Sequence, residues 1–201
     1  MKIYLVFCIL LSTAFGARIA VGQETPAGYT DKDAYEIYSA LLGEEWPVSV
    51  AKAKTLVIQT ETVDYPNMGD AMSCLAPAKG KESLFDPVLA AYHKANKSPA
   101  FLQRKFDESF TYELVSRDWI KKLFDEKSIG GWKDFYAKYP DSGGIISMSA
   151  VGFNVDKTIA LVYMGHSCGG LCGGGRYHML QKTDGKWAEI HWQDISCSWA
   201  S

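Results

Sequence analysis

Hydrophobic residues recur every three or four positions in four segments of the N-terminal two thirds of the chain, the spacing that lets a helix bury one face. Thr30 and Asp33 form a capping-box pair at the start of the first segment, and Gly43 is expected to end it. Ser83 and Ser116 are the expected caps of the second and third helices. The four helices are predicted over residues 30–43, 83–96, 116–126 and 132–139.

Two segments rich in β-branched and aromatic residues predict strands, at residues 55–63 and 110–115. From Gly144 onward the hydrophobic pattern changes from helical to strand-like, and Asp184-Gly185 is a strong signal for a tight hairpin turn. The strands expected in this part cover residues 145–153, 158–166, 177–183 and 186–192. The predicted fold class is therefore α+β, with N-terminal helices and one early strand before a C-terminal four-stranded antiparallel meander.

The N-terminus has the pattern of a secretory signal peptide. Lys2 supplies the positive start, an apolar run covers residues 3–15, and small residues follow, so cleavage is expected after Gly16 or Gly22. The run is too short for a stable membrane span. The predicted organisation is a signal peptide over residues 1–22, a polar tether over 23–30 and a single α+β domain over 31–201.

Four cysteines remain after the signal peptide: Cys74, Cys168, Cys172 and Cys197. An even number of cysteines in an exported chain favours disulfides over free thiols, so we expect a secreted or periplasmic protein. Four cysteines allow three pairings. We favour Cys168 with Cys172 and Cys74 with Cys197, because the second pair closes a long loop, and a crossed pairing stays open.

The formal net charge of the full chain is −2, and no basic patch is visible in the sequence. A mildly acidic domain of this kind argues against nucleic acid as a partner. The aromatic content, 13% of residues, suits either a well-packed core or a binding face. The expected partners are therefore a small molecule or an envelope protein.

The segment over residues 165–175, here called the Gly/Cys segment, holds six glycines around two cysteines. Glycine is unfavourable in regular helices and strands, so we expect this segment to be a wide loop at the tip of a hairpin. A disulfide, a metal or a ligand would then have to fix its shape. The candidate functional residues of the loop are His166, Gly169, Gly170, Gly173, Gly174 and His178.

Four kinds of chemistry could be placed at this loop. A Cys168–Cys172 disulfide is favoured, because the flanking glycines allow the required Cα spacing. The set His166, Cys168, Cys172 and His178 suits zinc, but the spacing is uncommon and an oxidising compartment removes thiolates. Thiol redox catalysis is disfavoured by the three residues between the cysteines, and an anion or oxyanion site lacks a following helix and a nucleophile motif. No catalytic residue, metal or cofactor is predicted.

Five sequence blocks stand out: Tyr139-Pro140, Ser149–Asn154, Ala160–Tyr163, Cys168–Gly173 and Gly185–Trp187. These blocks resemble those of a family of uncharacterised bacterial secreted proteins. The early helix and the early strand, over residues 35–42 and 56–62, are similar to that family as well. The resemblance implies a bacterial exported protein and brings no activity, cofactor or catalytic residue with it.

The order of elements also has a looser likeness to the ketosteroid-isomerase-like cone fold, in which helices precede a curved antiparallel sheet. The early strand at residues 55–63 departs from that order. This likeness implies a pocket between sheet and helices for a small ligand.

The function expected from the sequence is that of an exported, disulfide-stabilised, non-catalytic binding module for a small ligand or an envelope partner. The alternative is a secreted hydrolase or zinc protein that uses His166, Cys168, Cys172 and His178.

Overall fold

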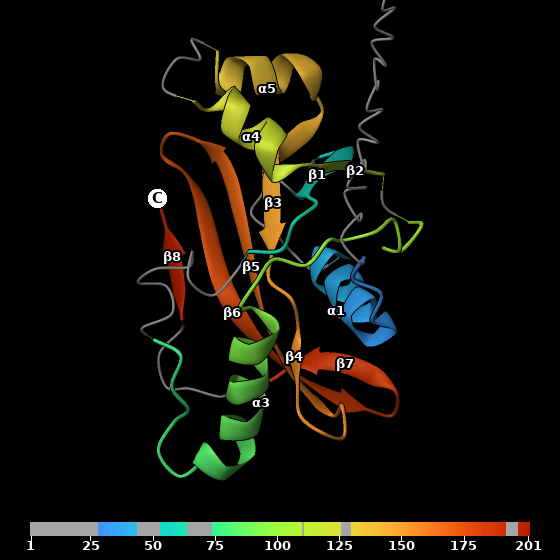
Figure 1. The fold of residues 1–201 in the computed structure, drawn as a ribbon, viewed down its shortest axis with the longest axis vertical. Helices are drawn as coiled ribbons and strands as arrows, with labels where there is room; N and C mark the ends of the chain where they lie inside the picture. Colours follow the sequence, from blue (N-terminus) through green and yellow to red (C-terminus); the bar gives the residue numbers. More distant parts are fainter. Residues whose placement is uncertain (1–27, 44–52, 64–73, 110, 126–129, 192–196) are drawn as a thin grey trace, which may run out of the picture.

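The computed structural model describes residues 28–43, 53–63, 74–109, 111–125, 130–191 and 197–201. The predicted signal peptide and most of the predicted tether lie outside these residues. The described part has an α+β fold, with four α-helices and one mixed sheet of eight strands (Figure 1). None of its helices has the length and apolar character needed to cross a membrane.

The elements follow one another along the chain in an order close to the one expected. In sequence order they are α1 (Lys32–Gly43), β1 (Thr55–Gln59), α3 (Glu82–Ala95), β2 (Tyr112–Val115), α4 (Arg117–Leu123), α5 (Trp132–Lys138), β3 (Ser142–Met148), β4 (Gly152–Phe153), β5 (Ile159–Gly169), β6 (Cys172–Thr183), β7 (Lys186–Glu189) and β8 (Ser198–Ala200).

All four predicted helices are present, but two of the predicted caps are wrong. Asp31 caps α1 in place of Thr30, because its carboxylate accepts from the backbone N–H groups of Asp33 and Ala34, at 3.1 and 3.4 Å. At the start of α3, Ser83 lies inside the helix.

Helix α3 begins at Glu82, and its N-cap residue, Lys81, makes no side-chain capping bond. Backbone N–H groups of Glu82 itself and of Gly80, which precedes the helix, lower the pKa of the Glu82 carboxyl. Ser116 caps α4 as predicted, with its hydroxyl accepting from the N–H of Trp119 at 3.2 Å.

The sheet has the strand order β2-β1-β3-β5-β6-β7, with β4 paired to β5 and β8 paired to β6. Strands β3, β5, β6 and β7 are antiparallel neighbours, as a meander requires, and Asp184-Gly185 forms the predicted turn. The meander is only part of the sheet, however. The early strand β1 lies parallel to both β2 and β3, so the sheet is mixed.

The single strand expected over residues 145–153 is broken at Ser149–Val151, between β3 and β4. Asn96, at the end of α3, is fully buried there and bonds Ala150 twice: its Nδ2 donates to the carbonyl, and its Oδ1 accepts from the N–H. The hydroxyl of Tyr38 on α1 donates to the Ser149 carbonyl at 2.7 Å. At the break, side chains from two helices thus replace the hydrogen-bond partners that a neighbouring strand would supply to the backbone.

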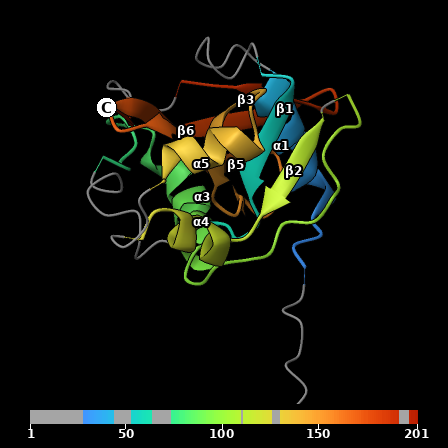
Figure 2. The same cartoon turned by 90° about the horizontal axis from the view of Figure 1, so that it is seen from above.

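Helices cover both faces of the sheet (Figures 1 and 2). On the first face, α1 packs its buried side chains against alternate residues of β1, β3 and β5, among them Ile58, Ile146 and Val162. On the second face, α3 packs against Leu161 and Met179, whereas α4 and α5 cover the other end of the sheet. Figure 2 shows α1 on one side of β1 and both α3 and α4 on the other.

Candidate functional site

The Gly/Cys segment is a continuous hairpin, and the expectation of a wide loop was wrong. Strand β5 continues to Gly169 and β6 starts at Cys172, so that only Gly170 and Leu171 form the turn. The pairing runs on to Gly169 opposite Cys172, with one irregularity between Ser167 and Gly169.

The glycines of this hairpin make room for aromatic side chains. A Cβ on Gly175 would lie 2.3 Å from the Tyr163 hydroxyl and 2.7 Å from Trp199 Nε1, and a Cβ on Gly165 would lie 2.7 Å from the same hydroxyl. Trp199 Nε1 donates to the Tyr163 hydroxyl at 2.8 Å. Glycine occurs here because another group closely approaches the strand. From the sequence alone, a glycine of this kind looks the same as a glycine in a loop.

The four cysteines form two disulfides, Cys74–Cys197 and Cys168–Cys172, which is the pairing favoured from the sequence. The Cα atoms are 5.6 Å apart in the first bond and 5.0 Å apart in the second. Cys197 is buried against the α3 side of the sheet. Cys172 is exposed, at the tip of the hairpin.

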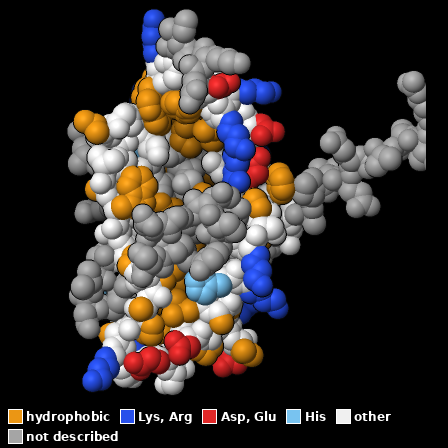
Figure 3. All heavy atoms as spheres, turned by 60° about the vertical axis from the view of Figure 1, so that its left-hand side comes forward, with side chains coloured by type: hydrophobic (Ala, Val, Ile, Leu, Met, Phe, Trp, Pro, Cys, Tyr) orange, Lys and Arg blue, Asp and Glu red, His pale blue; other side chains and the backbone are white. Residues whose placement is uncertain are grey.

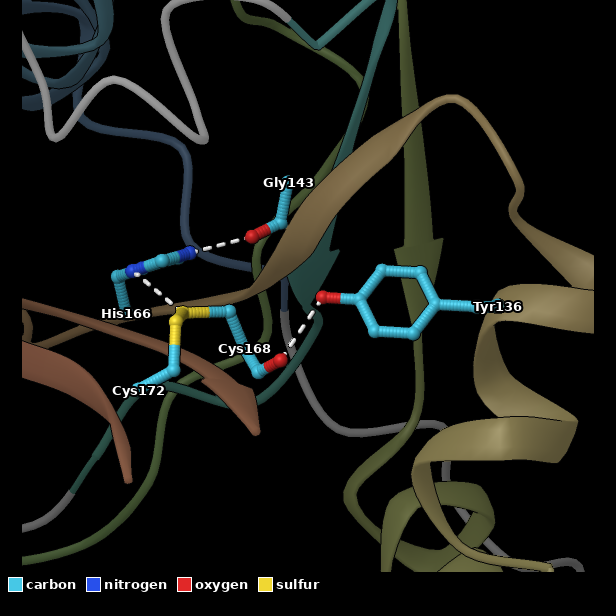
Figure 4. Close-up of a disulfide and its surroundings, with 5 residues drawn as sticks. All are labelled: Tyr136, Gly143, His166, Cys168 and Cys172. Atoms are coloured by element: carbon cyan, nitrogen blue, oxygen red, sulfur yellow. Dashed lines mark hydrogen bonds between the residues drawn. A yellow bond between two sulfur atoms is a disulfide. The ribbon is translucent and has the colours of Figure 1, made fainter. Parts of the chain in front are cut away.

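His166 is buried beside the second disulfide, on the first face of the sheet (Figure 4). Its Nε2 lies 2.5 Å from the carbonyl oxygen of Gly143, and its Nδ1 lies 3.8 Å from Cys168 Sγ. Because a carbonyl can only accept, Nε2 carries a proton and Nδ1 is the nitrogen that faces the sulfur. On the opposite side, the hydroxyl of Tyr136 donates to the Cys168 carbonyl at 3.0 Å.

His178 does not join His166 in a common site. The two residues lie on the same face of the hairpin, but His178 is four residues beyond Gly174, the partner of His166. The rise of a strand makes this separation about 13 Å. His178 Nδ1 instead lies 3.4 Å from Glu189 Oε1, and this approach lowers the pKa of the Glu189 carboxyl. The distance is that of an ion pair, without the geometry of a hydrogen bond.

The zinc set considered from the sequence is therefore not assembled. Cys168 and Cys172 are bonded to each other, and the two histidines are far apart. Among the residues that the structure describes, no three His, Cys, Asp or Glu side chains gather in a way that could hold a metal ion.

The glycine amides do not form the anion site considered either. Gly174 pairs with His166 on β5 and with Ala200 on β8, and the carbonyl of Gly173 accepts from the N–H of Ser201 at 3.0 Å. Both glycines thus belong to strand ladders on two sides. His166 and Ser167 point to opposite faces of the sheet, as neighbours in a strand do, so they cannot act as base and nucleophile.

A cavity of about 240 Å³ lies on the second face of the sheet, between the sheet and the two helices α4 and α5. We call it the sheet–helix cavity. The described residues that line it are Gln59, Ile120, Phe124, Trp132, Ile145, Ser147 and Ser167. Figure 3 shows hydrophobic side chains gathered near the upper end of the molecule, where α4 and α5 lie in Figure 1.

The base of the sheet–helix cavity comes from three neighbouring strands, and three of its four lining residues are polar, the fourth being Ile145 on β3. Gln59 on β1 is 9% exposed, and its Nε2 donates to the carbonyl of Glu61 at 2.6 Å, which fixes the orientation of the amide. Ser147 on β3 and Ser167 on β5 lie on the same face as Gln59. These side chains bring one amide and two hydroxyls to one place.

The wall of the cavity is aromatic. The rings of Phe124 and Trp132 are 4.8 Å apart, and Trp132 stacks on Tyr136 at 5.9 Å. Phe124 follows the last residue of α4 and keeps 38% of its surface exposed. The described lining carries no charged side chain.

Two hydrogen bonds fix the start of α4 above this cavity. The N–H of Arg117 donates to Glu61 Oε2 at 2.7 Å, and its guanidinium donates to the carbonyl of Thr62 at 2.8 Å. Both acceptors lie just after β1, which supplies Gln59. The helix that precedes Phe124 is thereby tied to the strand that carries Gln59.

Of the sequence candidates, only the Gly/Cys segment reaches this cavity, through Ser167. The signal that could have indicated the site is the pair Ser147 and Ser167, which interrupt largely apolar stretches of β3 and β5. A scan against protein-family models, a search of curated proteins and a search of solved structures each find no match to the chain.

Proposed function

We propose that this protein is an exported, non-catalytic binding module that holds a small neutral ring compound in the sheet–helix cavity. The observation that carries the proposal is an aromatic wall, Phe124 and Trp132, above a polar base of one amide and two hydroxyls. Ligand sites in proteins combine apolar walls with a few polar groups of this kind.

The chemistry of the lining defines the ligand class. An aromatic wall favours a flat ring, which it binds by stacking and by burial of apolar area. The amide of Gln59 and the hydroxyls of Ser147 and Ser167 favour neutral donors and acceptors on the edge of that ring. A charged ligand would lose its hydration without gaining an opposite charge from the described lining.

The volume limits the ligand to one ring. The cavity, at about 240 Å³, is smaller than the roughly 300–1,000 Å³ of pockets that take drug-sized ligands. This location between a sheet and its helices is also the one that the looser likeness to a cone fold implies.

Two disulfides support the exported location, because such bonds persist in oxidising compartments. The signal peptide at residues 1–22, the bacterial origin and membership of the exported family that the sequence resembles are part of the same proposal. The hydrolase or zinc alternative has no comparable support, since its cysteines are bonded together and its histidines lie apart.

The proposal is tested with benzamide and benzoate, which have the same shape and differ in charge. We expect benzamide to shift the indole N–H resonance of Trp132, with a Kd of about 1 mM, the value for about −4 kcal/mol from a ligand of this size. Benzoate should bind at least about tenfold more weakly, because its charge has no partner. A Trp132→Phe variant assigns the resonance.

Two variants connect the binding to the polar base. Gln59→Leu and Ser147→Ala should each weaken benzamide binding by about two- to tenfold, the effect of one neutral hydrogen bond. Ser83→Ala is the matched control, because Ser83 is exposed on α3, outside the cavity lining. Equal binding of benzamide and benzoate, or equal effects of all three variants, would contradict the proposal.

A further inference from the structure

The two disulfides differ in what they do for the fold. Cys74–Cys197 joins positions 123 residues apart and has one buried partner, Cys197. Cys168–Cys172 joins positions four residues apart, across a hairpin that the β5–β6 pairing already holds as far as Gly169 opposite Cys172. A disulfide that closes so short a ring restricts the unfolded chain less than one that closes a long loop. The second bond therefore contributes less to the stability of the fold than the first.

The second disulfide is also placed where another molecule can reach it. Cys172 is exposed, and its neighbour Leu171 in the turn has 91% of its surface exposed. Cys168 is half-buried and has the imidazole of His166 beside it. The two cysteines of one bond therefore have different surroundings: Cys172 is exposed, and Cys168 has His166 beside it, as Figure 4 shows.

The contact with Gly143 fixes the orientation of the His166 ring relative to the sulfur of Cys168. Its Nε2 proton is committed to the Gly143 carbonyl, so Nδ1 faces Cys168 Sγ at 3.8 Å in both the neutral and the protonated ring. As an imidazolium, the ring would donate from Nδ1 to a Cys168 thiolate, and this type of contact stabilises thiolates in reactive cysteine pairs.

We propose that Cys168–Cys172 is a redox-active disulfide that exchanges with an external dithiol, with His166 stabilising Cys168 as the leaving thiolate. A thiolate of the dithiol attacks Cys172 Sγ, the Cys172–Cys168 bond breaks, and Cys168 leaves with the electron pair and takes a proton through His166 Nδ1. The second thiol of the dithiol then attacks the mixed disulfide and releases Cys172. Two electrons pass to the protein, and the two protons of the dithiol end on the two cysteines.

This activity is independent of ligand binding in the sheet–helix cavity. His166 and the cavity lie on opposite faces of the sheet, and the cavity lining includes neither cysteine. A failure of one proposal therefore does not decide the other.

The test is limited reduction of the native protein with dithiothreitol, followed by iodoacetamide and identification of the labelled cysteines by mass spectrometry. Cys168 and Cys172 should be labelled at least about tenfold faster than Cys74 and Cys197. His166→Gln should slow the opening of the tip disulfide by about tenfold, which corresponds to about 1.4 kcal/mol in the barrier. Glutamine retains an N–H donor for the Gly143 carbonyl and removes the ring nitrogen that faces the sulfur.

His178→Gln is the matched control, because His178 is a buried histidine on the same face of the same hairpin, away from the sulfurs. It should leave the rate unchanged. Equal labelling of both disulfides, an unchanged rate in His166→Gln, or an equal loss in His178→Gln would overturn the proposal.

A second measurement needs no variant. Glutathione, followed by a rapid iodoacetamide quench, should leave the glutathione on Cys172 and the alkyl group on Cys168, since Cys168 is the leaving group. The reverse distribution, or an even one, would overturn the proposal even if His166→Gln did not fold.

Discussion

Gly144 is the position where a single methyl group should damage the fold most specifically. Its φ is +116°, a conformation that residues with a Cβ rarely adopt. A Cβ added there would lie 2.2 Å from the carbonyl oxygen of Ser167 and 3.0 Å from the Cα of Cys168. Gly144→Ala therefore combines backbone strain with a clash against the main chain of β5.

The magnitude follows from these two costs. Holding alanine at such a φ costs about 1–3 kcal/mol. Inserting a methyl group where the neighbouring backbone cannot yield costs about 1–3 kcal/mol more. We expect Gly144→Ala to lower the free energy of unfolding by about 2–6 kcal/mol, a large part of the roughly 5–15 kcal/mol of a typical domain. The melting temperature should fall by about 2–4 °C per kcal/mol.

Urea unfolding followed by far-UV circular dichroism measures this change. Gly170→Ala is the matched control, because a Cβ on Gly170 meets nothing within 4 Å. It should leave the free energy of unfolding within about 0.5 kcal/mol of the wild type. A Gly144→Ala protein as stable as the control would refute the close approach of β3 to the tip of the hairpin.

Three further predictions concern the rest of the fold. Asn96→Ala should lower the free energy of unfolding by about 2–4 kcal/mol, because it leaves buried backbone groups at the strand break without partners; a loss below about 1 kcal/mol in urea unfolding would speak against that role. The hydrogen bond from Lys182 lowers the pKa of Asp33 below 3.8, so this pair stabilises the fold at neutral pH and loses that effect as the pH falls through the folded-state pKa. Asp33→Asn should thus be less stable than the wild type at about pH 6 and nearly equal to it at about pH 2, and a constant difference would count against the ion pair. Replacing both Cys74 and Cys197 with alanine should cost about 2–5 kcal/mol, and an unchanged melting temperature would show that this bond does not stabilise the fold.

The sequence predicted the elements of this fold better than their ends. The helical spacing of apolar residues located all four described helices, although none of the residues of α4 is fully buried. Capping depends on one or two hydrogen bonds of a single side chain, and at the start of α1 Asp31 makes them in place of Thr30. The break after β3 depends on Asn96, more than 50 positions away in sequence, so no local pattern contains it.

The Gly/Cys segment shows why composition misleads in this protein. Its glycines predict a wide loop, and they occupy a continuous hairpin because Tyr163 and Trp199 lie across the strands. The sheet–helix cavity could not be predicted for a related reason. Gln59, Trp132 and Ser167 come together only when β1, α5 and β5 pack, although isolated serines in apolar strands were a usable signal.

The most direct test of the binding proposal is a crystal structure of the protein soaked with benzamide. We expect the benzamide ring against Trp132, with its amide within hydrogen-bond distance of Gln59, Ser147 or Ser167. Benzamide bound elsewhere, or a cavity closed by the protein's own side chains, would contradict the account.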